Sequence, residues 1–393
     1  MARMTGWRTS MCVAALATLA AGATAAPYVP QSDNVVLERL PEKGDPALAQ
    51  LKRMRRALAA RPADIDIAIP VARKALEAAR QLGDPRFLGQ AQAALAPWWT
   101  ADTVPPAALL LRATLKQSQH DFDGSLKDLD RLLAAQPAAA QARLTRATVL
   151  GVQGRYADAR RDCGELNGRV APIVFLGCDA VPASLSGAAA YAYTSLNDEL
   201  STQRGSSDLR EWALTLAAEI AERRGDFGAA ERHFHDALAL DPRDAYLKGA
   251  YADFLLERNR PEAVLPLLAN DASNDSLLLR LALAEQRVPA ARDAFVAHRA
   301  DLAARFEAAQ RRGDSLHRRE EARFRLDIEK AAPAALALAR ANWNVQREPA
   351  DLRILVDAAR AAGDAAALEI AAQWITSTRM ENVAVASVAM VRK

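Results

Sequence analysis

The chain has 393 residues, of which 51% are hydrophobic, 25% charged and 5% aromatic, and its formal net charge is +3. Ordinary hydrophobicity and charge argue against a disordered chain, and abundant alanine with few β-branched residues argues against a β protein. The near-neutral charge, with both signs interspersed, predicts no nucleic-acid binding. The length suffices for one elongated helical array.

The first 25 residues have the pattern of a secretory signal peptide. Arg3 and Arg8 form a basic start, residues 11–21 are apolar, and residues 23–25 supply an A-x-A cleavage site. Removing this leader would lower the net charge from +3 to +1, since Arg3 and Arg8 are its only charged residues. The apolar stretch is too short to span a bilayer permanently. We therefore expect a periplasmic or secreted protein that is not an integral membrane protein.

Residues 26–46 are predicted to form a proline-containing linker that precedes a long helical region, 47–380. Within that region Pro70 should kink its helix or delay the helix start. Residues 381–393 place valines at alternating positions, which is typical of a strand or a frayed tail.

Internal repetition organises the helical region. Two stretches repeat at a separation of 34 residues, and a third block, residues 211–244, carries the pattern most fully. Its small, bulky and turn residues are Leu214, Ala218, Gly225, Phe227, Ala230, Phe234, Ala237 and Pro242. Small residues let two antiparallel helices approach closely, and the proline ends the second helix.

This pattern resembles the tetratricopeptide repeat, and the chain is similar to uncharacterised exported bacterial proteins of that family. The resemblance implies an all-α fold, an α-solenoid of antiparallel helix pairs wound into a superhelix. It is best in residues 106–139, 140–173, 211–244, 245–275 and 318–351.

Two cysteines remain outside the leader, Cys163 and Cys178. In an oxidising compartment they could form a disulfide, remain buried thiols, or belong to a redox or metal site. A redox site is not supported, because the sequence has no C-x-x-C motif here. A metal site is not supported either, because no further His or Cys lies nearby. The repeat register places the cysteines on neighbouring helices, which favours a disulfide worth roughly 3 kcal/mol.

No catalytic motif is present. The sequence lacks nucleotide-binding and serine-hydrolase motifs, and His233 and His235 are spaced for different faces of a helix. We therefore expect no enzyme activity, no cofactor and no metal site.

Two candidate binding surfaces follow from the repeat register. First helices of such repeats line the concave face, where the predicted groove residues are Trp212, Thr215, Glu219, Glu222, Tyr246 and Asp253. A charged stretch with Arg318, Arg319 and Arg323 is either a self-compensated exposed helix face or a docking patch. The mildly acidic groove would suit a protein or peptide with a basic segment.

The sequence thus predicts a periplasmic scaffold that binds a protein or peptide. The alternative is a structural subunit of an envelope assembly for secretion, polysaccharide export or cell-wall machinery. Fold alone does not decide between these roles.

Overall fold

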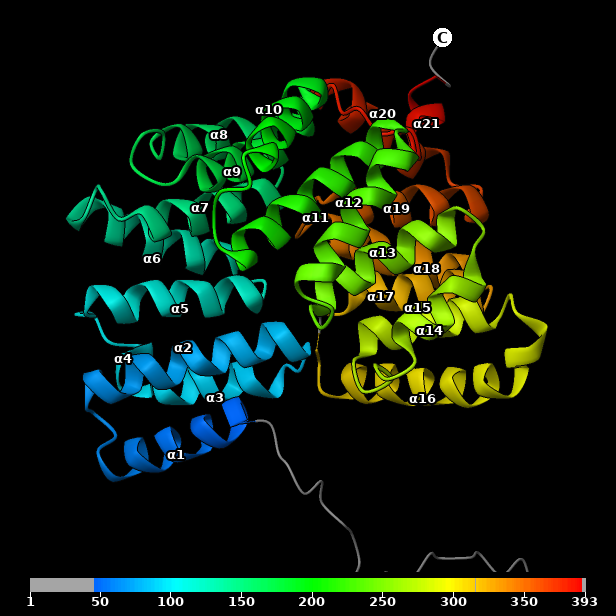
Figure 1. The fold of residues 1–393 in the computed structure, drawn as a ribbon. Helices are drawn as coiled ribbons and strands as arrows, with labels where there is room; N and C mark the ends of the chain where they lie inside the picture. The colour runs from blue at the N-terminus through cyan, green and yellow to red at the C-terminus, as the bar shows by residue number, and fades with distance from the viewer. Residues whose placement is uncertain (1–45, 315, 391–393) are drawn as a thin grey trace, which may run out of the picture. The chain divides into compact units, whose positions relative to one another are not determined.

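The computed structural model describes residues 46–314 and 316–390. The predicted signal peptide and the linker up to residue 45 lie outside the described residues. The described residues from Ala47 onward form one compact unit of helices and turns, without any strand among them (Figure 1).

The helices follow one another along the chain as pairs. The first half contains α1 (Pro46–Ala60), α2 (Ile65–Leu82), α3 (Arg86–Ala94), α4 (Ala96–Trp99), α5 (Pro106–Ser118), α6 (Phe122–Ala135), α7 (Ala140–Val152), α8 (Tyr156–Gly164), α9 (Pro172–Ser184) and α10 (Ala189–Ser201). The second half contains α11 (Ser207–Arg224), α12 (Phe227–Leu240), α13 (Ala245–Glu257), α14 (Pro261–Leu268), α15 (Asp275–Glu285), a 3-10 turn (Pro289–Ala291), α16 (Arg292–Arg311), α17 (Arg318–Arg323), a π-helical turn (Phe324–Ile328), α18 (Ala332–Trp343), α19 (Pro349–Ala362), α20 (Ala365–Thr378) and α21 (Ala386–Met390). From α5 onward each odd-numbered helix up to α19 packs against the next helix in the chain.

Glycine followed by aspartate makes two of the turns inside these pairs. Gly225 ends α11 with φ of +83°, and Asp226 begins α12 by accepting a 3.0 Å hydrogen bond from the Ala229 amide. Gly363 and Asp364 repeat this device between α19 and α20. Because only glycine adopts positive φ at little cost, and an aspartate satisfies orphan amides, the Gly-Asp pairs fix where these helices end and begin.

Two local expectations need correction. α2 begins at Ile65, so Pro70 lies inside the helix at an exposed position and does not delay the helix start. The segment after residue 380 forms no strand in its described part: residues 381–385 are irregular and α21 follows. Val385 and Val388 are both buried, and their spacing of three places them on one side of a helical turn.

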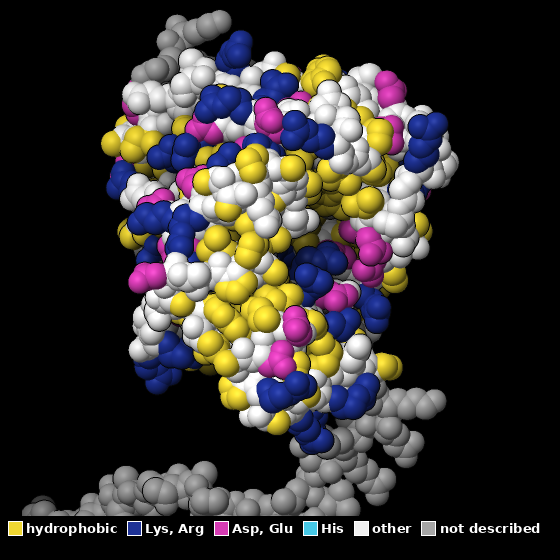
Figure 2. Space-filling view, turned by 90° about the vertical axis from the view of Figure 1, so that its left-hand side faces the viewer, with side chains coloured by type: hydrophobic (Ala, Val, Ile, Leu, Met, Phe, Trp, Pro, Cys, Tyr) yellow, Lys and Arg dark blue, Asp and Glu magenta, His cyan; other side chains and the backbone are white. Residues whose placement is uncertain are grey.

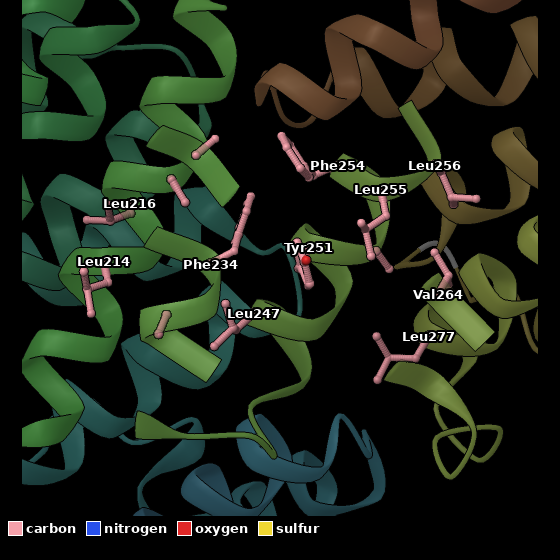
Figure 3. Close-up of a cluster of buried hydrophobic side chains, with 14 of the residues drawn as sticks. Leu214, Leu216, Phe234, Leu247, Tyr251, Phe254, Leu255, Leu256, Val264 and Leu277 are labelled. Atoms are coloured by element: carbon pink, nitrogen blue, oxygen red, sulfur yellow. The ribbon is translucent and has the colours of Figure 1, made fainter. Parts of the chain in front are cut away.

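Small and aromatic side chains build the core between the helix pairs. Phe234 of α12 is fully buried, with its ring centroid 5.3 Å from that of Tyr251 and 5.6 Å from that of Phe254, both on α13 (Figure 3). Ala218 and Ala230, predicted as the small contact residues, are also fully buried. The repeat pattern therefore describes the packing of this block correctly.

The solenoid also folds back on itself, so that segments far apart in sequence touch. Arg80 at the end of α2 forms a 2.7 Å ion pair with Asp244 at the start of α13. The amide of Arg347, after α18, donates a 2.7 Å hydrogen bond to the carbonyl of Val152 at the end of α7. In Figure 1 the C-terminal helices accordingly lie beside the middle of the chain.

The irregular residues after α20 add further contacts between the C-terminal part of the chain and its middle. The carboxylate of Glu381 accepts a 3.2 Å hydrogen bond from the amide of Ala189, where α10 begins without a cap of its own. The amide of Val383 donates a 2.9 Å hydrogen bond to the carbonyl of Arg223 near the end of α11. Helix-terminal groups of the middle repeats are thus satisfied by the C-terminal segment.

The predicted disulfide is confirmed. Cys163 in α8 is bonded to Cys178 in α9, with their Cα atoms 5.6 Å apart. The bond joins the second helix of one pair to the first helix of the next, as the register predicted.

Reduction of this disulfide should lower the free energy of unfolding by about 3 kcal/mol, because the bond restricts a short loop of the unfolded chain. Cys163 is fully buried, so the thiols keep their packing and the loss is mainly entropic. Thermal unfolding of oxidised and reduced protein measures it. An unchanged melting temperature, or two titratable thiols in the denatured oxidised protein, would contradict the bond's role.

Candidate functional site

The predicted groove residues separate into two groups. Thr215 is only 3% exposed, and its hydroxyl donates to the Glu211 carbonyl at 3.0 Å, so its predicted groove position was wrong. Trp212 is half-buried and packs against Gly177 of α9, where an added Cβ would lie 2.4 Å from the indole. Both side chains contribute to packing between repeats.

Asp253 meets the residue predicted as part of the docking patch. Its carboxylate forms an ion pair with Arg323 of α17 and a 2.6 Å ion pair with Arg280 of α15. Burial favours the neutral acid, but the charges of Arg280 and Arg323 prevail and hold the pKa of Asp253 below its usual value. Asp253 of the predicted groove and Arg323 of the predicted patch therefore pair with each other inside the protein.

A second patch arginine, Arg319, is also turned inward. Arg319 makes ion pairs with Glu348 at 2.9 Å, Asp351 at 3.4 Å and Glu320 at 3.2 Å. Arg318 is half-buried rather than exposed. The stretch is neither the exposed helix face nor the exposed docking patch that the sequence suggested, because α17 packs into the return contact with α13 and α19.

Three groove residues remain accessible, and we call Glu219, Glu222 and Tyr246 the acidic cluster. The Tyr246 hydroxyl donates a 2.6 Å hydrogen bond to Glu219, which joins α13 to α11. Tyr246 is 62% exposed. Glu222 is half-buried and makes no ion pair with any residue in the described part of the chain.

The environment of the acidic cluster raises its pKa values. Burial, followed by the charges of Glu257, Glu219 and Asp253, raises the pKa of Glu222 to about 8. Burial also raises the pKa of Glu219, against the lowering effect of Arg223. Several carboxylates with little neutralising charge between them make this face electrostatically receptive to a cation.

Sequence reasoning missed the acids and arginines that surround the cluster. Asp351 is fully buried, accepts a 2.8 Å hydrogen bond from Asn342, and has its pKa raised by burial to about 6. Arg353 of α19 forms a 3.4 Å ion pair with Glu257 of α13. The charged residues of α17 and α19 were visible in the sequence, but their position opposite α13 depends on the fold-back. Figure 2 shows basic and acidic side chains together beside a hollow in the surface.

Metal-ligand groups and membrane-spanning helices are both absent from the described residues. Residues 46–314 and 316–390 contain no group of three or more His, Cys, Asp or Glu side chains arranged to hold a metal ion. No helix within the same residues is long and apolar enough to cross a membrane.

Among known proteins, this chain is similar only to solved structures. No family model matches this sequence, and no curated protein matches it. A tetratricopeptide repeat protein from Parabacteroides merdae is 14% identical over 73% of this chain and 98% of its own, with a TM-score of 0.38. The tetratricopeptide domain of P58(IPK) is 16% identical over 74% of this chain and 98% of its own, with a TM-score of 0.21. Yeast Tom70 is 12% identical over 88% of both chains, with a TM-score of 0.26.

The helix pairs, the turn glycines and the alanine contacts within this chain settle its fold class. The fold is a tetratricopeptide-like α-solenoid. The TM-scores are too low to indicate a function, and the function must be inferred from the site of this chain.

Proposed function

We propose that this protein is a periplasmic scaffold without catalytic activity of its own, which binds a basic segment of a protein or peptide at the acidic cluster. One observation carries the proposal: Tyr246 is largely exposed and hydrogen-bonded to Glu219, while Glu222 beside it has no ion-pair partner in the described chain. A buried carboxylate without a counter-charge is costly, and a partner's Lys or Arg would relieve that cost.

The cluster offers two kinds of contact to such a segment. A Lys or Arg side chain could pair with Glu222, and its cation could lie over the exposed Tyr246 ring, a contact worth about 0.5–2 kcal/mol. Asp253 is no longer included, because Arg280 and Arg323 already neutralise it. The site is thus smaller than the six-residue groove predicted from the sequence.

The test is affinity capture from periplasmic extract with the wild-type protein and with Glu222→Lys. Capture at about pH 9 is preferred, since wild-type Glu222, with a pKa of about 8, is then largely ionised. We expect Glu222→Lys to lose the wild-type partner, because it replaces attraction by repulsion. Glu307→Lys on α16 is the matched control, since that side chain is 67% exposed and lies outside the cluster. Equal capture by Glu222→Lys and Glu307→Lys would reject the acidic cluster as the binding site.

A further inference from the structure

The first helix carries an exposed basic face. Lys52, Arg53, Arg55 and Arg56 of α1 are all exposed, and none of these side chains bonds to another described residue. No acidic residue occurs between residues 46 and 63. We call these four side chains the α1 basic face.

The opposite face of α1 is apolar and already occupied. Leu51 and Leu58 are buried in the core that α1 shares with α2 and α3, and Leu48 and Met54 pack against it. Helical spacing of 3.6 residues per turn therefore directs Lys52, Arg53 and Arg56 away from the core. The small alanine side chains at positions 49, 59 and 60 leave the neighbouring cations exposed.

The α1 basic face lies at the end of the helix stack. Figure 1 places α1 below α2 and α3 with no further described helix on its outer side, and Figure 2 shows Lys and Arg side chains gathered at that end. A nearly neutral chain thus concentrates positive charge that no described residue compensates on one terminal surface.

We propose that the α1 basic face docks the protein on the surface of an anionic lipid bilayer. A cluster of four or more Lys and Arg on one amphipathic helix is the pattern that anionic headgroups attract. An end helix can lie flat on a bilayer with Lys52, Arg53 and Arg56 at headgroup depth. Since the apolar face is buried against α2 and α3, the docking is electrostatic and does not require helix insertion.

A protein partner fits this face less well. Stable protein interfaces depend on aromatic or apolar anchors at their centre and are depleted of lysine there. The outer side of α1 presents only Ala, Gln, Lys and Arg side chains. These side chains provide positive charge but no aromatic or large apolar anchor. A layer of lipid headgroups needs no anchor, only charge of the opposite sign.

The experiment is co-sedimentation of the full chain with lipid vesicles. Vesicles of phosphatidylcholine alone are compared with vesicles that contain about 30% phosphatidylglycerol, at about 0.05 M and about 0.5 M salt. We expect binding to the anionic vesicles only, and release at high salt. Equal binding to both vesicle types, or binding that survives high salt, would overturn the proposal, because it would show apolar anchoring elsewhere.

Variants assign the binding to α1. Arg53→Glu with Arg56→Glu should weaken partitioning at least about 25-fold, at about fivefold per cation. Arg292→Glu with Arg299→Glu on α16 makes the same change in net charge at exposed sites and should bind as the wild type does. If the acidic variant misfolds by circular dichroism, Arg53→Gln with Arg56→Gln replaces it. Equal weakening by the α1 and α16 variants would overturn the assignment.

A soluble polyanion separates lipid docking from general charge attraction. Polyglutamate and a short DNA duplex are measured against the wild-type chain at the lower salt concentration. Weaker binding to both than to anionic vesicles supports the lipid surface. Binding to either that equals or exceeds vesicle binding would overturn it in favour of an acidic protein or a nucleic acid.

Discussion

Replacement of Asp128 by alanine is expected to destabilise the fold by about 3–5 kcal/mol, because it leaves a buried guanidinium without its counter-charge. Asp128 is 3% exposed and Arg112 is 5% exposed. The Arg112 guanidinium donates to both carboxylate oxygens of Asp128, at 2.5 Å and 2.7 Å, and Lys116 adds a 2.8 Å contact. Arg112 also donates to the carbonyls of Trp98 and Trp99, which ties α4 to α5 and α6.

Urea unfolding of Asp128→Ala beside Asp130→Ala measures this effect. Asp130 is two residues away and 63% exposed, and its ion pair with Arg146 should contribute no more than about 1 kcal/mol. Replacing Arg112 and Asp128 together by Met and Leu should recover much of the loss, since no unpaired charge then stays buried. A loss below about 1 kcal/mol for Asp128→Ala would mean that the two tryptophan carbonyls satisfy Arg112 without a carboxylate.

The helix pairs could be predicted because their determinants are local. Gly225, Asp226, Ala230 and Phe234 lie within ten residues of one another, and each does in the structure what its position in the repeat predicts. The disulfide was predictable for the same reason, since Cys163 and Cys178 are fifteen residues apart on neighbouring helices.

The fold-back could not be predicted, because its contacts link residues that are distant in sequence. Asp253 and Arg323 are 70 residues apart, and each was assigned a different external role from its local pattern. No repeat register states that α17 will face α13. Of the predicted groove residues, Thr215 is buried and Asp253 is paired with two arginines, so Glu219, Glu222 and Tyr246 are those that remain for the proposed contact.

Average charge was similarly uninformative about α1. The net charge of +3 conceals a helix with four exposed cations and no acid, because acids elsewhere in the chain offset them. Whether a cation is compensated depends on its spatial neighbours, and the described residues supply acidic partners for Arg112 and Arg323 but none for Arg53 and Arg56.

Stability is expected to fall as pH rises from about 5 to about 8, by an amount on the order of 4 kcal/mol. Burial is the main cause of the raised pKa of Glu222, about 8, and of Glu211, about 7, with the charge of Asp244 adding to the latter. Both acids stay protonated in the folded protein at pH values where the unfolded chain has released their protons. The stabilisation is complete below about pH 4.5 and is lost as pH passes through the folded values.

The substitution Glu222→Gln measures how much of this loss of stability comes from ionisation of Glu222. The amide cannot ionise, so the variant should lose a substantial part of the decline in stability between pH 5 and pH 8 and should be more stable than wild type at pH 8, while the raised pKa values of Glu211 and Asp351 leave the remainder. Glu307→Gln on α16 is the control, because its side chain is 67% exposed, and it should follow the wild-type curve. The lowered pKa values of Asp128 and Asp253 act only in acid, outside this window. If Glu222→Gln and wild type decline in parallel between pH 5 and pH 8, Glu222 is ionised throughout, and the acidic cluster holds a full negative charge at neutral pH before any partner binds.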